Sequence, residues 1–310
     1  MMQLRRGSVL DLLKQIFLRN RYWSDFVLLG LLALMYVPLL LHWYIGWTKK
    51  TISIEHEYFS HGLIGLPFAG YIAWTNRKRW QRLAPNTTSK ESPDATGRAK
   101  IFGAVLLLVS GVFYLSGLPD PVNLSFPLLL TGICLWLKGF EGLKLQGFAL
   151  LLVFLATPNE IPYLIAPYTL PLQSFIAGTA GFILNQFGMN VTVQHIYLFV
   201  GDRLVEVAPY CAGLKMLFTS LYVSLMLLWW TGNLRSRSFR TVFLISTMLI
   251  SVSANIIRNT MLTFFHGTGQ EQAFKWLHEG WGGDIYSMAM LGLLVVLSNQ
   301  LEKFFSPSNS

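Results

Sequence analysis

A cysteine stands in the segment VEVAPYCAGLKML, where an extended stretch gives way to an apolar run over residues 214–230. Pro209 fixes a backbone angle that suits the start of a helix, so we predict that Cys211 lies in the first turn of a membrane helix. Unpaired backbone amides and the helix dipole favour a thiolate there, and the thiolate is the form that attacks carbonyl groups. Lys215, four residues further on, shares this helix face and adds positive charge. A lone cysteine in a membrane protein is also commonly a small packing residue, so this segment alone leaves both interpretations open.

Two more residues with chemical potential lie near the ends of later apolar segments. Arg258, in SANIIRNTMLTFFHG, carries a guanidinium that could hold an oxyanion, although such an arginine can also extend to the lipid headgroups. His278, in FKWLHEGWGGD, could protonate a leaving group near neutral pH, although a single histidine at a membrane surface is more often only a hydrogen-bonding residue. We predict that Cys211, Arg258 and His278 form a catalytic site, with His266 as the next histidine candidate.

The composition indicates a multi-pass membrane protein. The chain of 310 residues is 53% hydrophobic with a mean hydropathy of +0.47, and its few charges are bunched, which excludes an ordinary soluble domain. The net charge of +9 does not indicate nucleic-acid binding here, because Lys and Arg mark the cytoplasmic ends of membrane helices. The two cysteines form no disulfide scaffold, and Cys134, inside the apolar run LLLTGICLWL, is predicted to be an inert core residue.

The positions of the charges predict about eight membrane crossings with both termini in the cytoplasm. The basic segment 1–24 precedes an uncleaved first span, and the basic, turn-rich stretch 76–100 is predicted to be a cytoplasmic linker. Residues 25–302 form a single transmembrane domain, followed by a cytoplasmic tail, 303–310. The predicted spans cover residues 26–47, 62–74, 101–118, 124–137, 147–157, 214–230, 242–262 and 285–301.

The segment 158–210 is predicted to lie on the extracytoplasmic side. Its first part, 158–187, has four prolines and scattered glycines, so it is a poor straight helix that could cross the bilayer or pack at the outer surface. The stretch NVTVQHIYLFVGDRLVEVA then alternates like two strands about the turn residues Gly201 and Asp202, and unpaired strands cannot lie in lipid. We therefore favour the surface position. The predicted fold is an all-α polytopic membrane protein with a small extracytoplasmic β-hairpin and a proline-broken surface segment.

In these motifs the chain resembles the exosortases and archaeosortases, and within them the cyanobacterial exosortases (cyanoexosortases) of the B type. The marks of the family are a cysteine followed by a small residue and glycine, an arginine three residues after an asparagine, and a histidine followed four positions later by glycine. They occur here as Cys211, Ala212 and Gly213, as Asn255 and Arg258, and as His278 and Gly282. The segment EHEYFSHGLIGLPFAGY also resembles an early block of the cyanobacterial branch. Ala212 is a departure, because many members have serine at this position.

The resemblance implies a membrane-embedded cysteine protease or transpeptidase, similar in its cysteine, histidine and arginine chemistry to the sortases but on an unrelated fold. Its substrates would be exported proteins with a C-terminal sorting tail, which consists of a short Pro-Glu-Pro motif, a hydrophobic span and a basic cluster. The expected location is the plasma membrane, with the active site on the extracytoplasmic face. A tail inserted in the same bilayer would bring its cleavage site beside the thiol, so the expected partners are such substrates and the lipid bilayer.

Outer basic residues are the candidates for binding the glutamate of a Pro-Glu-Pro motif. Lys215, Arg203 and Lys275 lie on the predicted outer side near the proposed site. Asn255 accompanies Arg258 in the family motif, and we place it with these three as a predicted substrate-binding residue. We expect no cofactor, no bound metal and no nucleic-acid partner.

Three other functions fit parts of the sequence. A transporter is common among eight-span proteins and would use the broken segment 158–187, but the polar candidates gather at one face rather than at mid-membrane. A metalloprotease would need His56 and His61 of HEYFSH on one helix face, yet their spacing puts them roughly 140° apart, against roughly 40° in a zinc motif. A non-catalytic membrane assembly factor would need none of these residues and stays open.

Overall fold

The chain folds into long helices and one small sheet. In the computed structural model the described residues are 30–48 without 33, 58–84, 93–207, 213–278 and 280–305. The helices are Gly30–Thr48, α3 (Gly62–Thr75), α4 (Arg77–Arg82), α5 (Pro93–Leu115), α6 (Pro119–Ala156), α7 (Ile161–Ile165), the 3-10 helix η1 (Ala166–Thr169), α8 (Leu170–Gln186), α9 (Leu214–Trp230), the 3-10 helix η2 (Asn233–Arg235), α10 (Arg237–Gly267), α11 (Glu271–His278) and α12 (Trp281–Phe305). The strands are β1 (Val191–Gln194), β2 (Tyr197–Val200) and β3 (Arg203–Glu206).

Five helices of the described chain are long and apolar enough to cross a membrane. They are Gly30–Thr48, the part Gly97–Leu115 of α5, α6, α10 and α12, while α3 and α9 are shorter apolar helices. The predicted class, an all-α polytopic membrane protein, is confirmed. The number of crossings and the orientation of the termini stay predictions, and the predicted cytoplasmic segment 1–24 lies outside the described residues.

α6 consists of two arms that meet at a sharp break. Gly139 interrupts the helix with φ +62° and ψ −156°, a backbone conformation that glycine adopts without a steric penalty. The chain folds back after the break. This is seen at Gly142, where a Cβ would lie 3.3 Å from the carbonyl oxygen of Cys134, a residue that a continuous helix would place more than two turns away. The two predicted spans 124–137 and 147–157 fall in the two arms. Cys134 is buried, as predicted.

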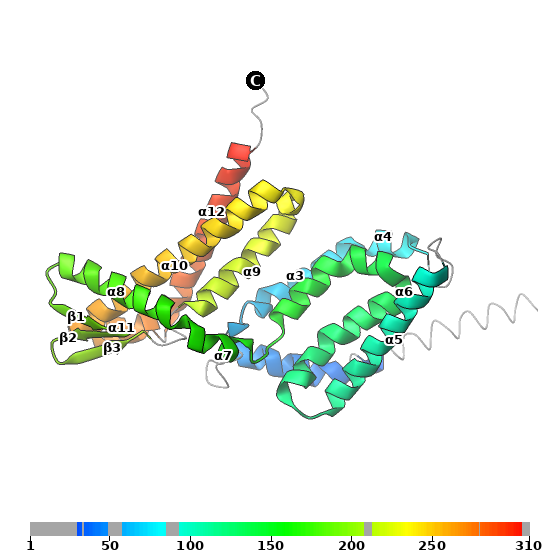
Figure 1. Cartoon of the computed structure of the whole chain (residues 1–310), viewed down its shortest axis with the longest axis horizontal. Coiled ribbons are helices and arrows are strands. Elements are labelled where there is room, and N and C mark those ends of the chain that lie inside the picture. The colour runs from blue at the N-terminus through cyan, green and yellow to red at the C-terminus, as the bar shows by residue number, and fades with distance from the viewer. Residues whose placement is uncertain are drawn as a thin grey trace, which may run out of the picture.

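The helices gather in two groups (Figure 1). α3, α5 and α6 pack together in one group, and α9, α10 and α12 pack together in the other. The sheet, α8 and α11 lie at one end of the second group. The N-terminal half and the C-terminal half of the chain therefore form separate bundles that have to be joined by specific contacts.

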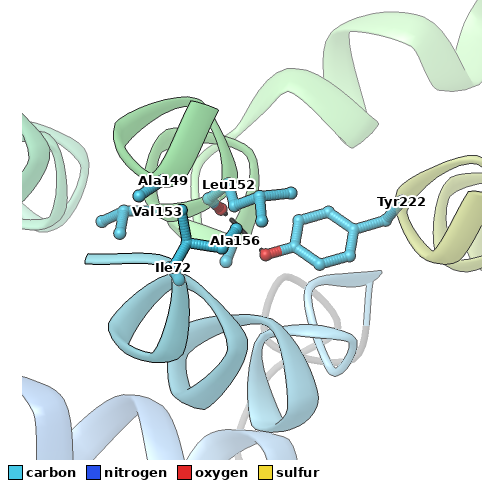
Figure 2. Close-up of a cluster of buried hydrophobic side chains, with 7 residues drawn as sticks. Ile72, Ala149, Leu152, Val153, Ala156 and Tyr222 are labelled. Atoms are coloured by element: carbon cyan, nitrogen blue, oxygen red, sulfur yellow. Dashed lines mark hydrogen bonds between the residues drawn. The ribbon is translucent and has the colours of Figure 1, made fainter. Parts of the chain in front are cut away.

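The two groups are joined at Tyr222, which lies in α9 (Figure 2). Its hydroxyl donates a hydrogen bond to the Leu152 carbonyl oxygen of α6 at 3.0 Å, and its ring lies 4.4 Å from the ring of His61. His61 Nε2 donates to the carbonyl oxygen of Leu155 at 3.1 Å. The Tyr222 hydroxyl and Nε2 of His61 are thus paired inside an otherwise apolar cluster, which avoids the cost of leaving these two groups without hydrogen bonds in a membrane.

The starts of α3 and α9 lie at the same end of the molecule. Tyr58 and Phe59, just before α3, pack against Leu214 in a buried cluster. The opposite end of α3 meets the start of the second arm of α6, where Asn76 Nδ2 donates to the Leu145 carbonyl oxygen at 3.0 Å. The second arm of α6 therefore ends at the same end of the molecule as the start of α9.

The sheet has three antiparallel strands in the order β1, β2, β3, not the two that we predicted. The predicted turn at Gly201 and Asp202 is present, with Val200 opposite Arg203 and φ +58° at Gly201. The preceding turn has φ +56° at His195, an uncommon conformation for a residue other than glycine. This turn has no glycine, and for that reason its sequence did not reveal β1.

The proline-rich segment is broken into consecutive helical pieces. Pro162, Pro167 and Pro171 each occupy the first or second position of a piece, in α7, η1 and α8 respectively. Proline is well tolerated at these positions, because it has no N–H to donate and its φ already suits a helix. The prediction of a proline-broken segment is confirmed, and α8 is not among the candidate spans.

Two predicted boundaries have to be corrected. The predicted linker 76–100 contains α4 and the first turns of α5, so these parts of it are helical, while residues 85–92 lie outside the described residues. α9 begins at Leu214 after a left-handed Gly213, so Cys211 precedes the first turn instead of lying in it. Cys211 and Pro209 themselves lie outside the described residues.

The joint at Tyr222 should measurably stabilise the fold. We expect Tyr222→Phe to lower the free energy of unfolding by about 1 kcal/mol, because one buried hydrogen bond is lost. Tyr222→Ala should lower it by about 3–5 kcal/mol, because the ring is also lost from the cluster. The measurement is unfolding of the protein in lipid nanodiscs, with Tyr44→Phe at an exposed position as the control. Equal stabilities of Tyr222→Phe and Tyr44→Phe would contradict this role of the hydroxyl.

Candidate functional site

The candidate site lies where α9 begins and α10 approaches its end. Met216 of α9, Ala254 of α10 and Met290 of α12 form one buried cluster. This cluster holds the start of α9 and the first half of α12 beside the middle of α10. Residues that are far apart in the sequence are thereby brought to one end of the second helix group. The predicted nucleophile, Cys211, lies outside the described residues. The site is therefore defined by the described residues that follow Cys211 in the chain and by those that pack against them.

Gly213, two residues after Cys211, packs directly against α10. Its backbone is left-handed, with φ +80°, and a Cβ at this position would lie 2.6 Å from Cγ and 2.7 Å from Nδ2 of Asn255. Glycine is therefore required both by the backbone conformation and by the closeness of the neighbouring side chain. Asn255 is only 1% exposed. The chain just after Cys211 is thus held against the interior of the bundle.

Arg258 lies three residues after Asn255, close to one helical turn, and reaches the start of α12. A Cβ on Gly283 would lie 3.8 Å from Nη2 of Arg258 and 2.9 Å from the carbonyl oxygen of Leu277. The half-buried guanidinium also interacts electrostatically with Tyr286 of α12. Arg258 therefore points at the junction of α11 and α12, near the Leu277 carbonyl group and the Tyr286 phenol.

His278 is the last residue of α11 and lies at the same junction. It follows Leu277 directly, and its ring is stacked on that of Phe274 with 5.2 Å between centroids and 9° between planes. The two residues are four apart on α11, so this stack is local and fixes the plane of the imidazole. The structure thus brings Arg258 and His278 to one junction, and their chemical roles stay predictions.

Arg203 braces the other end of α11 from the sheet. Its Nη1 donates to the carbonyl oxygen of His266 at 2.8 Å and to Oε1 of Glu271 at 2.5 Å, which links β3 to the end of α10 and the start of α11. The ring of His266 also lies 5.2 Å from that of Phe274. We predicted a substrate-binding role for Arg203, but sequence reasoning missed the partner Glu271. An acidic residue in the first turn of a helix was the available signal.

The two lysines predicted to bind substrate lie in different surroundings. Lys215 is half-buried in the first turn of α9, whereas Lys275 is exposed on α11. Lys215 follows Gly213 closely, so its position along α9 is determined by the same contact with α10. Neither residue is bonded to Arg203 in the described contacts.

A stripe of buried polar residues on α10 was missed by the sequence analysis. It consists of Thr247, Ser251, Asn255, Asn259 and Thr263, each at most 3% exposed. These residues recur every four positions and therefore share one helix face. Polar side chains are rare inside membrane helices and commonly mark functional positions. This spacing was visible in the sequence, and it extends the neighbourhood of Asn255 along the helix.

The motif HEYFSH does not gather metal ligands in the described chain. His61 is buried and bonded to the Leu155 carbonyl oxygen, while His56 lies outside the described residues. Among residues whose placement is described, no three side chains of His, Cys, Asp or Glu lie close enough to hold a metal ion.

The fold and the site together define a polytopic membrane protein with a polar site at one end of a helix bundle. A search of protein-family models matches residues 46–295 to transmembrane exosortase (Exosortase_EpsH). Since the match covers most of the chain, the protein belongs to the transmembrane exosortase family, which indicates a membrane protein of sorting-signal processing. No curated protein and no solved structure matches the chain. The resemblance to exosortases is confirmed, while the cyanobacterial B type stays a prediction.

Gly213 offers a test of the contact that positions the start of α9. Gly213→Ala and Gly232→Ala each place a Cβ on a backbone with positive φ, but only the first also meets a neighbour, because the space around Gly232 is open. We expect Gly213→Ala to lose about 1–3 kcal/mol more unfolding free energy than Gly232→Ala. Adding Asn255→Ala should recover part of this difference, since it removes the two nearest atoms. Equal losses in the two glycine variants would show that the contact with Asn255 is unimportant.

Proposed function

We propose that this protein is a membrane-embedded cysteine protease or transpeptidase that cleaves C-terminal sorting signals of the Pro-Glu-Pro type from exported proteins. The observation that carries the proposal is the packing of Gly213 on Asn255, which holds the chain after Cys211 one turn from Arg258. The family match over residues 46–295 supports the same activity. The reaction takes place at the plasma membrane, with both termini in the cytoplasm and the active site on the extracytoplasmic face.

The proposed reaction begins with attack of the Cys211 thiolate on the carbonyl carbon of the scissile peptide bond. Arg258 stabilises the resulting oxyanion, because its charge persists at any working pH and its planar fork offers several N–H donors. The C–N bond then breaks, and His278 gives its proton to the leaving amine. This step leaves a thioester between Cys211 and the substrate. An incoming nucleophile gives a proton to His278, attacks the thioester and releases the thiolate.

Substrate selection depends on the membrane and on charge. A tail anchored in the same bilayer meets the enzyme in two dimensions, so orientation and encounter cost less than for a soluble peptide. The glutamate of the Pro-Glu-Pro motif is an anion, and Lys215, Arg203 and Lys275 are basic groups proposed to attract it. Arg203 also holds Glu271 and the His266 carbonyl oxygen, and Lys215 is the closest of the three to Cys211 in the sequence. Asn255 acts by positioning the start of α9.

The test of this proposal is tail removal from a co-expressed substrate that carries a Pro-Glu-Pro sorting tail. We expect Cys211→Ala to abolish removal while the protein still inserts in the membrane, because alanine offers no nucleophile. Cys134→Ala is the matched control and should process normally, because Cys134 is buried in the other helix group. Normal processing by Cys211→Ala would end the enzyme proposal and favour a transporter or a non-catalytic assembly factor.

The roles of Arg258 and His278 can be separated by their response to pH. Arg258→Lys should lose most activity although it keeps the charge, because the fork geometry is lost. His278→Gln should lower the processing rate by about 10²–10⁴-fold and remove the fall in rate at high pH that deprotonation of a general acid causes. The measurement is the processing rate against external pH for each variant. If removal of His278 changes neither rate nor pH dependence, His278 is not the general acid, and His266 is the next candidate.

A further inference from the structure

One face of the α7–α8 segment exposes large apolar side chains. Leu164, Tyr168, Phe175 and Phe182, which we call the α8 stripe, are 69%, 81%, 57% and 64% exposed. They are four, seven and seven residues apart, which keeps them near one side of consecutive helical turns. An apolar face of this length is unusual for a surface in contact with water.

The stretch that carries the α8 stripe has no charged side chain. No Asp, Glu, Lys or Arg occurs between Glu160 and Asp202. The side of α8 that faces away from the stripe is buried, since Ile176, Ala180 and Leu184 pack in one cluster with the sheet and with Ile256 of α10. α8 therefore has two apolar faces. One of them packs against the rest of the protein, and the other, the α8 stripe, needs apolar surroundings that the described part of the chain does not supply.

The contacts at both ends of the α7–α8 segment place these ends in the same half of the helix bundle. α7 follows the end of α6, which His61 ties to the same end of the molecule as the start of α9. β3, which follows α8, is tied by Arg203 to the His266 carbonyl at the end of α10. The start of α9 lies beside the middle of α10, where Met216 packs on Ala254. α7 and α8 therefore begin and end in the half of the bundle that contains the C-terminal half of α10.

We propose that α7 and α8 lie in the plane of the membrane interface at this end of the bundle, with the α8 stripe inserted among the lipid acyl chains. The lipid surface is favoured over a protein partner because α8 packs against α10, a candidate span whose Ile257 and Phe264 are also exposed. Aromatic side chains suit the boundary between headgroups and acyl chains. The insertion holds the sheet, and through Arg203 the end of α10 and the start of α11, at the membrane surface.

This proposal goes beyond the cleavage reaction and holds whether or not the protein is a protease. Its test uses spin labels on single cysteines at Tyr168→Cys, Phe175→Cys and Phe182→Cys, in full-length protein that also carries Cys134→Ala and Cys211→Ala. The control is Asp202→Cys, in the exposed turn between β2 and β3. The protein is placed in phosphatidylcholine and phosphatidylglycerol vesicles, and the accessibility of each label to oxygen and to a water-soluble nickel chelate is measured.

We expect the three stripe labels to be more accessible to oxygen than to nickel, and the label at position 202 to show the reverse. The depths of labels 168 and 182 should agree within about 5 Å, whereas a crossing helix would separate them by about 21 Å. A depth gradient of that size, or nickel accessibility equal to that at position 202, would overturn the proposal. Protection of the stripe from both reagents would also overturn it, because a protein partner such as a substrate span would then cover the stripe.

A second measurement needs no substitution. A lipid-soluble diazirine should label the peptide 161–187 of the unmodified protein as strongly as peptides of α5, and much more strongly than peptides of the sheet. Labelling of 161–187 at the level of the sheet would contradict the insertion.

Discussion

The close contact between Gly213 and Asn255 is the constraint on which the candidate site depends. Because a glycine in the left-handed region lets the chain approach α10 without a side chain, α9 can begin beside the interior of the bundle. The position of Lys215 follows from this start, and Gly213 is held against Asn255, which lies about one turn before Arg258 on α10. A Cβ at position 213 would separate the two helices at the level where the site is built.

The site also combines rigid support with charged side chains. α11 is short, but Arg203 fixes its start through Glu271, and Phe274 fixes the ring of His278 near its end. Arg258 reaches this junction from α10, with dipoles around its guanidinium. Such an arrangement keeps a cation and a titratable ring in place without burying an isolated charge in lipid. The stripe of buried polar residues on α10 extends from Asn255 toward the start of this helix.

The membrane class, the broken segment and the turn at Gly201 could be predicted because each depends on local sequence: apolar runs, prolines at helix starts, and a tight turn. β1 was missed as a separate strand because the turn between β1 and β2 contains His195, whose positive φ has no clear sequence signal. The exact start of α9 was missed because Pro209 suits a helix start and the role of Gly213 depends on a side chain of a distant helix. That contact and the pair of Arg203 and Glu271 are tertiary, so spacing alone could not reveal them. The convergence of Arg258 and His278 on one side was predicted from topology, whereas their common neighbour, Gly283, was not.

The central claim is that Cys211 becomes covalently attached to the substrate beside Arg258 and His278. The most direct measurement is mass spectrometry of the protein after rapid acid quenching in the presence of a substrate with a sorting tail. The account predicts a thioester adduct on the peptide that contains Cys211, with accumulation of this adduct in any variant that slows the second step more than the first. Substrate turnover without an adduct on that peptide, or an adduct on the peptide that contains Cys134, would contradict it.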